Sequence, residues 1–161
     1  NEFFGFSFFD QQLLDRGIDI RQGRDHLQMS ETPVQHYVSQ HYVAVNVDRS
    51  LAEVLEAMVN AKVTEAYIVD TSTRFSGKLL LHDVLLAEDN VLLTDLSVLD
   101  PITINHDASI SQAIKDASNF IGESIPVINH QSRDFLGVVT EADLFQAYLA
   151  IQSQMRHLEK N

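Results

Sequence analysis

Two stretches of the chain show the same pattern of apolar and polar positions. After Ser50 and again after Ser109, apolar residues follow at i, i+3, i+4 and i+7, which is the spacing of one buried helix face. The two stripes are Leu51, Val54, Leu55 and Met58, and then Ile110, Ala113, Ile114 and Ala117. We therefore expect an amphipathic helix in each place, with one side packed against a core.

Each of these stripes follows a residue that can cap a helix. Ser50 has Glu53 three residues later, and Ser109 has Gln112 at the same distance. In a capping box of this kind, each of the two side chains bonds the backbone N–H of the other residue. The sequence predicts a complete capping box at the start of both helices.

Strand-like runs surround each predicted helix. They are short, rich in apolar and β-branched residues, and separated by polar turns. The predicted strands cover 42–47, 66–69 and 78–81 around the first helix, and 101–104, 125–128 and 135–140 around the second. A further helix closes each unit, so each unit is expected to have the order β-α-β-β-α.

The two units read as copies of each other. The stretch that begins Val45-Asn-Val-Asp48 returns as Ile104-Asn-His-Asp107, an offset of 59 residues (104 − 45) that also places Arg133 on Arg74. One inserted residue after that arginine brings Gly77 onto Gly137 and Asp83 onto Asp143. A repeat of about 55–60 residues is typical of a duplicated structural unit. Because one three-stranded sheet cannot cover two helices alone, we expect the two units to pack together in an α+β fold.

The repeats divide the chain into three parts. Residues 1–31 form an aromatic N-terminal segment and linker, 32–92 the first repeat, and 93–161 the second repeat with an extended C-terminal helix. The first nine residues include Phe3, Phe4, Phe6, Phe8 and Phe9. Such a segment is either a flap on the core or the end of a contact with a missing domain. Residues 10–28 are polar and contain two glycines, so we expect a linker with one short helical turn at most.

The last helix carries an apolar seam spaced four and three residues apart. Its members are Leu144, Tyr148, Ile151, Met155 and Leu158. The seam is too short for an independent coiled coil, so it packs on the module's own core or on a second copy. The apolar residues left over by one pair of units lead us to expect a homodimer.

Composition removes several classes of function. The 161 residues contain no Cys, which excludes disulfides and thiolate metal sites. A formal net charge of −12 disfavours nucleic acid and anionic membrane surfaces as partners. The seven His residues are scattered, so no metal site is expected. We find no nucleophile motif, glycine-rich loop or carboxylate pair, and we expect no catalysis.

The second unit carries a motif that resembles a known family. Gly137-Val-Val-Thr140-Glu-Ala-Asp143-Leu144, preceded by Ile125-Pro126-Val127, is similar to the signature of a cystathionine β-synthase (CBS) domain pair, or Bateman module. The resemblance covers residues 33–151. It implies two tandem β-α-β-β-α CBS repeats packed as a pseudo-twofold pair, with a regulatory rather than catalytic function.

The resemblance also implies a ligand site for an adenine nucleotide. Asp143 would bind the ribose hydroxyls and the Thr140 hydroxyl would contact the ribose or phosphate, while Thr103, Ile104, Ile125 and Pro126 would line the base pocket. No cofactor is required, and adenosine, AMP or ATP would be the regulatory ligand. The same Thr140 and Asp143 also fit a simple capping box at a helix N-terminus, which alone would select these residue types.

The first copy departs from this signature, because Leu80 stands where the second copy has Thr140. Leu can neither cap a helix nor bind a phosphate, so we expect at most one site per chain. Lys115 and Arg133 are the nearby cations of the second unit. With so little positive charge, adenosine or a monophosphate is a better ligand than a triphosphate.

The N-terminal residues show a second resemblance, to one group of proteins that contain CBS pairs. The stretch Phe8-Phe9-Asp10-Gln-Gln-Leu-Leu-Asp-Arg-Gly17-Ile18-Asp19 resembles the segment after the last transmembrane helix of CLC chloride channels and transporters. The chain would then be an excised cytosolic module at the cytoplasmic face of the cell membrane, joined to a membrane-embedded transport domain of the same chain. The alternative is a CBS pair that regulates a soluble enzyme or another transporter, such as a magnesium transport protein, or that acts alone.

Overall fold

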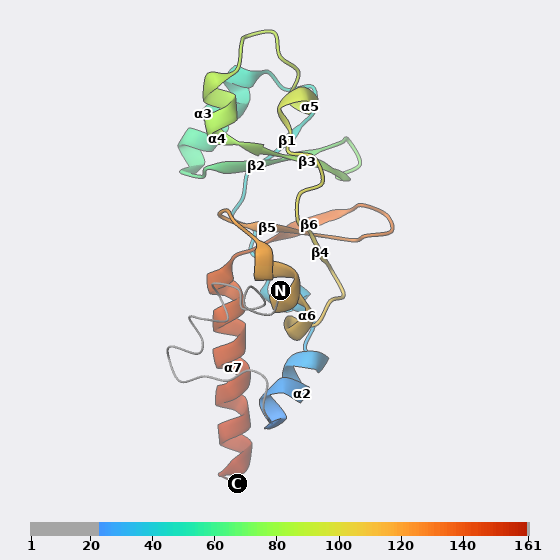
Figure 1. The fold of residues 1–161 in the computed structure, drawn as a ribbon, viewed down its shortest axis with the longest axis vertical. Helices are drawn as coiled ribbons and strands as arrows, with labels where there is room; N and C mark the ends of the chain where they lie inside the picture. The colour runs from blue at the N-terminus through green and yellow to red at the C-terminus, as the bar shows by residue number, and fades with distance from the viewer. Residues whose placement is uncertain (1–22, 161) are drawn as a thin grey trace.

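The computed structural model describes residues 23–160. Two three-stranded sheets lie one above the other at the centre of the molecule, with helices on their outer sides (Figure 1). The first repeat contains a 3₁₀ helix η2 (Val34–Tyr37), β1 (Ala44–Asn46), α3 (Leu51–Ala61), β2 (Glu65–Val69), β3 (Phe75–Leu80) and α4 (Leu81–Leu86). The second contains α5 (Leu93–Leu96), β4 (Ile104–Asn105), α6 (Ile110–Asp116), η3 (Ala117–Asn119), β5 (Ile125–Ile128), β6 (Phe135–Val139) and α7 (Glu141–Glu159). The predicted α+β class and element order are confirmed.

Both sheets have the same topology. Their strand orders are β1-β2-β3 and β4-β5-β6, with a parallel first pair and an antiparallel second pair. The register places Ile68 opposite Gly77 in the first sheet and Val127 opposite Gly137 in the second. The two glycines therefore occupy equivalent positions, as the repeat predicted.

The predicted capping box is complete at α3, whereas at α6 only the serine half of it forms. Ser50 and Glu53 form the complete box at the start of α3. At α6, the Ser109 hydroxyl accepts the Gln112 N–H, but the Gln112 side chain donates to Asp116 Oδ1 at 2.8 Å. A glutamine at N3 has an amide donor as well as an acceptor, and here the acidic residue four positions later binds that donor.

The inserted residue of the second repeat lies earlier than we predicted. Thr73 (φ 62°) and Arg133 (φ 70°) both hold the left-handed position of their turns. The Asp70 N–H donates to Arg74 O, and the Asn129 N–H donates to Asp134 O in the same way. Arg133 is therefore the counterpart of Thr73, and the insertion lies inside the β5–β6 turn rather than after an arginine pair.

The two repeats contact each other through reciprocal backbone bonds. The Phe75 N–H donates to Arg133 O at 2.7 Å, and the Phe135 N–H donates to Thr73 O at 3.0 Å. Between the sheets, the Phe75 and Phe135 rings stack with their centroids 6.1 Å apart. This exchange of equivalent contacts is the pseudo-twofold packing that was expected of the pair.

The stretch expected to be a linker contains a packed helix. Helix α2 spans Gly23–Glu31 and lies against the second repeat, beside α6 and α7 (Figure 1). Met29 on this helix is 1% exposed and belongs to the core that contains Ile114 and Tyr148. The prediction of one helical turn at most is therefore wrong. The aromatic segment of residues 1–9 lies outside the described residues.

Helix α2 also changes the account of the C-terminal seam. Leu144, Tyr148 and Ile151 are buried in the chain's own core, whereas Leu158 is 72% exposed. The seam is therefore covered within the chain along the first part of α7. These residues do not support a homodimer, contrary to the reasoning from the sequence.

Candidate functional site

The signature of the second repeat begins at Gly137, where another part of the chain crosses β6. Ser39 and Val138 exchange two backbone hydrogen bonds of 2.7 and 3.1 Å. Gly137 has φ +145°, and a Cβ atom built there would overlap Val38 and lie 2.8 Å from the Ser39 carbonyl oxygen. Glycine is required here because the segment that enters the first repeat lies directly on the strand of the second.

Thr140 and Asp143 form the start of α7. The Thr140 hydroxyl accepts the Asp143 N–H at 3.0 Å, and Asp143 Oδ2 accepts the Thr140 N–H at 2.9 Å. This is a complete capping box, as the structural interpretation of the motif predicted. Both residues are half-buried. The box uses one oxygen of the Asp143 carboxylate, and the other oxygen has the chemistry to accept a hydrogen bond at the positively polarised helix end.

The equivalent place in the first repeat has different chemistry. Leu80 precedes α4 and makes no side-chain cap, and α4 is only six residues long. Beside it lies a cavity of about 400 Å³, lined by Thr64, Glu65, Leu80, Leu81, His82 and Leu85. Three leucines in this wall give an apolar surface without a hydroxyl at the helix start.

The four residues expected in the base pocket come from β5 and from the start of β4, and three of their side chains are buried. The side chains of Ile104 and Ile125 are fully buried in the core formed with α6 and α7. Pro126 is also buried, and it lies opposite Val138 in the β5–β6 pair. Ile125 lies opposite Val139, the residue before Thr140, so β5 runs alongside the strand that ends at Thr140.

Thr103 directly precedes β4, and the parallel register of β4 with β5 places it beside Pro126 of β5. Its hydroxyl is 3.0 Å from His130 Nε2, beyond the last residue of that strand. It lines a second cavity of about 350 Å³ with Ser76, Ser97, Val98, Leu99, Asp100, Pro101 and Arg133. Within this sheet, β5 lies between Thr103 and the strand that leads to Thr140.

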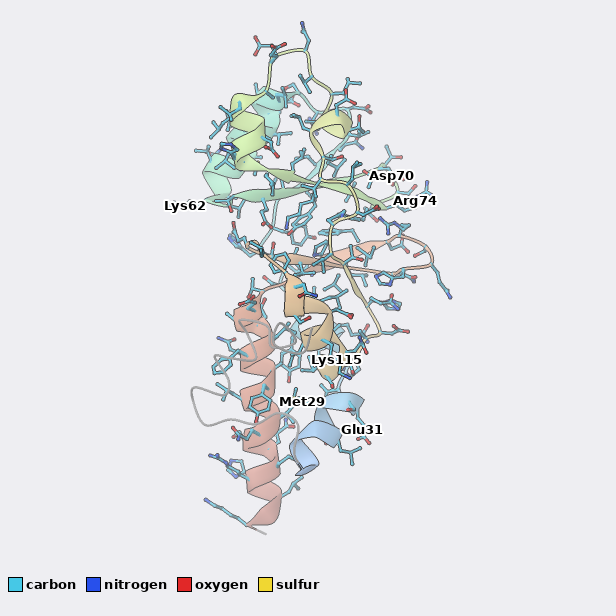
Figure 2. All side chains as sticks on the ribbon, viewed as in Figure 1. Met29, Glu31, Lys62, Asp70, Arg74 and Lys115 are labelled. Carbon is cyan, nitrogen blue, oxygen red and sulfur yellow. The ribbon has the colours of Figure 1, made fainter. Side chains whose placement is uncertain are left out.

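The cations named from the sequence are also distant from the Thr140–Asp143 pair. Lys115 is exposed on α6, away from the two sheets (Figure 2). Arg133 stacks over the Phe75 ring, 5.4 Å from its centroid, in the β5–β6 turn. Neither side chain supplies positive charge to the start of α7.

A buried ion pair that was not predicted lies within the first repeat, at its contact with the second. Lys78 Nζ lies 2.6 Å from Glu65 Oε2, and the two side chains are 7% and 6% exposed. Lys78 also donates to Ser124 O of the second repeat and lies over the Phe120 ring. A lysine within an otherwise apolar strand was the only signal of this pair in the sequence.

Tyr67 completes the polar contact between the sheets. Its hydroxyl bonds both the carbonyl and the hydroxyl of Ser124. Burial raises the pKa of the Tyr67 phenol well above its ordinary value. The phenol therefore stays neutral and can donate to Ser124 throughout the physiological range.

No group of His, Asp and Glu side chains within residues 23–160 is arranged to hold a metal ion. Over the same part of the chain, no helix combines the length and the apolar character that crossing a membrane requires.

Comparison with known proteins gives the family and the fold. The CBS domain profile matches residues 34–90 and 93–150. The comparison with curated proteins gave no match. Similar solved structures include a CBS domain pair/ACT domain protein of Thermotoga maritima, with a TM-score of 0.65 and 18% identity over 74% of this chain and 98% of that one.

Two other similar structures hold nucleotides. One is CBSX2 in complex with AMP, with a TM-score of 0.64 and 19% identity over 75% of this chain and 98% of that one. The other is the cytosolic domain of the Mg²⁺ channel MgtE in complex with ATP, with a TM-score of 0.64 and 20% identity over 87% of this chain and 59% of that one. The TM-scores of these structures establish a shared fold. Because the two profile matches cover most of its length, the chain belongs to the CBS domain family and contains a tandem pair of its domains.

Proposed function

We propose that this CBS pair is a regulatory module that binds one adenine nucleoside or nucleoside monophosphate at the start of α7. The observation that carries the proposal is the geometry of Asp143. Its Oδ2 closes the capping box with Thr140, and its Oδ1 has the chemistry to accept a hydrogen bond from a ribose hydroxyl. Leu80 removes this chemistry from the first repeat, so the module binds one ligand per chain.

In this proposal, the helix end recognises the sugar. A carboxylate that accepts a hydrogen bond from a hydroxyl group forms a charge-assisted hydrogen bond, which is stronger than a neutral one. The base-pocket role of Thr103, Ile104, Ile125 and Pro126 remains part of the proposal. Since the side chains of Ile104 and Ile125 are buried, contacts with the base would come from their backbone.

Two similar structures support the ligand class. CBSX2 was solved with AMP, and the MgtE cytosolic domain was solved with ATP. Both ligands contain adenosine and differ in their phosphates. This supports an adenosine-containing ligand for the present chain, and the scarcity of cations at the start of α7 favours the less charged members of that class.

We further propose that the module belongs to a chloride-transporting membrane protein and lies at the cytoplasmic face of the membrane. The resemblance of residues 8–19 to the segment after the last membrane helix of CLC proteins supports this assignment. A membrane-embedded transport domain of the same chain would be its partner. The alternative is that the module regulates a magnesium transporter or a soluble enzyme. Of these two, the similarity to the cytosolic domain of MgtE supports the magnesium transporter.

The homodimer also remains a proposal, on a different surface from the one predicted. Val59 of α3 and Leu85 and Leu86 of α4 are exposed apolar side chains on the outer helices of the first repeat. A second copy that covered them would remove these apolar groups from water. Sedimentation equilibrium of wild type and Leu86→Glu tests this: the variant should be monomeric at concentrations where wild type is dimeric.

Calorimetric titration with adenosine, AMP, ADP and ATP tests the ligand proposal. Wild type should bind adenosine or AMP with one site per chain. Asp143→Ala should weaken binding by about 10- to 100-fold, the worth of a hydrogen bond to a charged group. Asp83→Ala is the matched control in the first repeat and should bind like wild type. Equal binding by folded Asp143→Ala and wild type would contradict the assignment.

A further inference from the structure

The carboxylate of Glu65 leaves its own repeat and binds the backbone of the other. Oε1 accepts the Glu123 N–H at 2.9 Å, and the Ser124 N–H donates to Oε2 at 3.3 Å. Lys78 Nζ lies 2.6 Å from Oε2, and both charged side chains are at least nine-tenths buried. One carboxylate thus receives two successive backbone N–H groups and an ammonium, which we call the Glu65 cradle.

The backbone around this cradle is built for close approach of an anion. Gly122 has φ +149°, and a Cβ atom there would overlap Glu65 Oε1 and lie 2.9 Å from the Phe120 ring. Only glycine therefore allows the carboxylate to reach the two N–H groups. Successive N–H groups that point at one place are a common way to bind carboxylate and phosphate oxygens.

The cradle has no equivalent on the other side of the pseudo-twofold axis. The counterparts of Glu65 and Lys78 are Ser124 and Val138, so neither charge is repeated. The reverse contact is made by Glu123, whose carboxylate accepts the N–H and hydroxyl of Thr64. That contact is exposed, and Glu123 is in none of the ion pairs among residues 23–160, so it serves as a natural control.

The cradle adjoins the proposed ligand site. Ile125 lies opposite Val139, which makes Ser124 the neighbour of Thr140 across the two strands. A ligand whose sugar meets Asp143 would therefore have the Ser124 and Glu123 N–H groups within reach of a phosphate. These are the donors that Glu65 already occupies.

We infer that Glu65 is an internal ligand: its carboxylate occupies an anion-binding cradle of the second repeat and closes it to the phosphate of a bound nucleotide. The inference rests on the proposed function for the identity of the outside ligand. A phosphate that entered would have to expel a buried carboxylate from its partner Lys78, and it would then lie beside the displaced Glu65 and beside Glu123. The module consequently recognises the nucleoside part and gains no affinity from phosphate.

Chemical rescue tests the cradle without any nucleoside. Glu65→Ala leaves Lys78 and two N–H groups without their anion, so its thermal midpoint should fall, and sodium formate should restore most of the loss. Sodium chloride at the same ionic strength should not. Formate should leave wild type, Glu123→Ala and the double variant Glu65→Ala/Lys78→Met unchanged. If formate stabilises Glu65→Ala no more than it stabilises Glu123→Ala, the cradle does not bind anions and the inference is wrong.

A second variant covers the case in which Glu65→Ala does not fold. Glu65→Gln keeps the shape of the side chain and removes its charge. The account predicts that the amide protons of Glu123 and Ser124 move upfield in nuclear magnetic resonance spectra, because both lose a charged acceptor. Unchanged chemical shifts of these two amide protons would contradict their hydrogen bonds to the Glu65 carboxylate.

Nucleotide titration then tests the consequence for selectivity. Wild type should bind AMP no more tightly than adenosine, and in Glu65→Ala the preference for AMP over adenosine should rise about tenfold or more, as one or two charge-assisted hydrogen bonds allow. A preference for AMP that is equal in both proteins would overturn the inference. Absence of adenosine binding in wild type would count against the proposed function alone, since formate rescue does not depend on it.

Discussion

Ser39 of the first repeat pairs alongside β6 of the second, next to Gly137, and its carbonyl oxygen would be only 2.8 Å from a Cβ atom at that glycine. The contact joins the two repeats at the first residue of the signature that ends in Asp143. The glycine of this motif is therefore explained by packing between repeats. Its threonine and aspartate are explained, at least in part, by the capping of α7.

Replacing Gly137 by alanine should destabilise the protein strongly. The substitution places a Cβ against Val38 and Ser39 and forces alanine to adopt φ +145°. We expect the free energy of unfolding to fall by more than about 2 kcal/mol in urea titrations. Gly77→Ala is the matched control, because its Cβ would lie 3.0 Å from Ser97 Cβ and its φ is not in the left-handed region. Equal losses in the two variants would contradict this account of Gly137.

Removing the Thr140 hydroxyl should cost the energy of a helix cap. Thr140→Val keeps the side-chain shape but cannot accept the Asp143 N–H, which is bonded at 3.0 Å in the wild type. We expect the free energy of unfolding to fall by about 1 kcal/mol. Thr140→Ser keeps the acceptor and should lie within a few tenths of wild type. A Thr140→Val protein as stable as Thr140→Ser would show that the cap contributes nothing.

Helix α2 should stabilise the second repeat through one residue. Met29 is 1% exposed in the core of that repeat, whereas Leu27 on the same helix is 60% exposed. Met29→Ala should lower the free energy of unfolding by about 2–5 kcal/mol, the usual cost of a large truncation in a core. Leu27→Ala should change it by less than about 0.5 kcal/mol. Similar effects of the two substitutions would mean that α2 does not pack as described.

The turn between β2 and β3 should contribute stability that is lost in acid. The Asp70 carboxylate accepts the backbone N–H groups of Arg74 and Ser72 and the Arg74 Nε–H, and the Arg74 backbone bond is the main cause of its lowered pKa. Figure 2 shows Asp70 and Arg74 at the end of the sheet, in the turn that approaches the second repeat.

A carboxyl group with a lowered pKa in the folded state stabilises that state when it is ionised. This contribution is therefore complete above the ordinary aspartate pKa of about 3.9 and is lost as the pH falls through the lower folded value. Asp70→Asn should be less stable than wild type at neutral pH, and the difference should shrink below about pH 4. Urea titrations at neutral and acidic pH measure it. A difference that stays constant with pH would remove Asp70 ionisation as its cause.

The repeated elements were predictable because their signals are local. The stripe after Ser50 and the stripe after Ser109 each show helix spacing within one short window, and the offset between them repeats. The motif from Gly137 to Asp143 is local in the same sense, so both its cap and its place at the start of a helix followed from the sequence. Its counterpart at Leu80 could be excluded as a cap for the same reason.

The features that were missed depend on contacts between distant parts of the chain. Helix α2 is mostly polar, and its formation depends on the burial of Met29 against residues more than 80 positions later. The same packing covers Tyr148 and Ile151, which removed the expected dimer surface. The Glu65 cradle joins positions 58 and 59 residues apart, so no window of sequence contains both the carboxylate and its donors. Thr103 was placed with Thr140 by family resemblance, but β5 lies between them.

The most direct measurement of the central claim is a nuclear magnetic resonance titration of the isotope-labelled chain with adenosine. The account predicts that the amide signals of Thr140 and Asp143 shift and saturate with a single ligand per chain, while those of Leu80 and Asp83 stay in place. Asp143→Asn should weaken the shifts at the start of α7 without moving the signals of α3. Adenosine that shifts Leu80 and Asp83 but not Thr140 and Asp143, or that shifts neither pair, would contradict a nucleoside site at the start of α7.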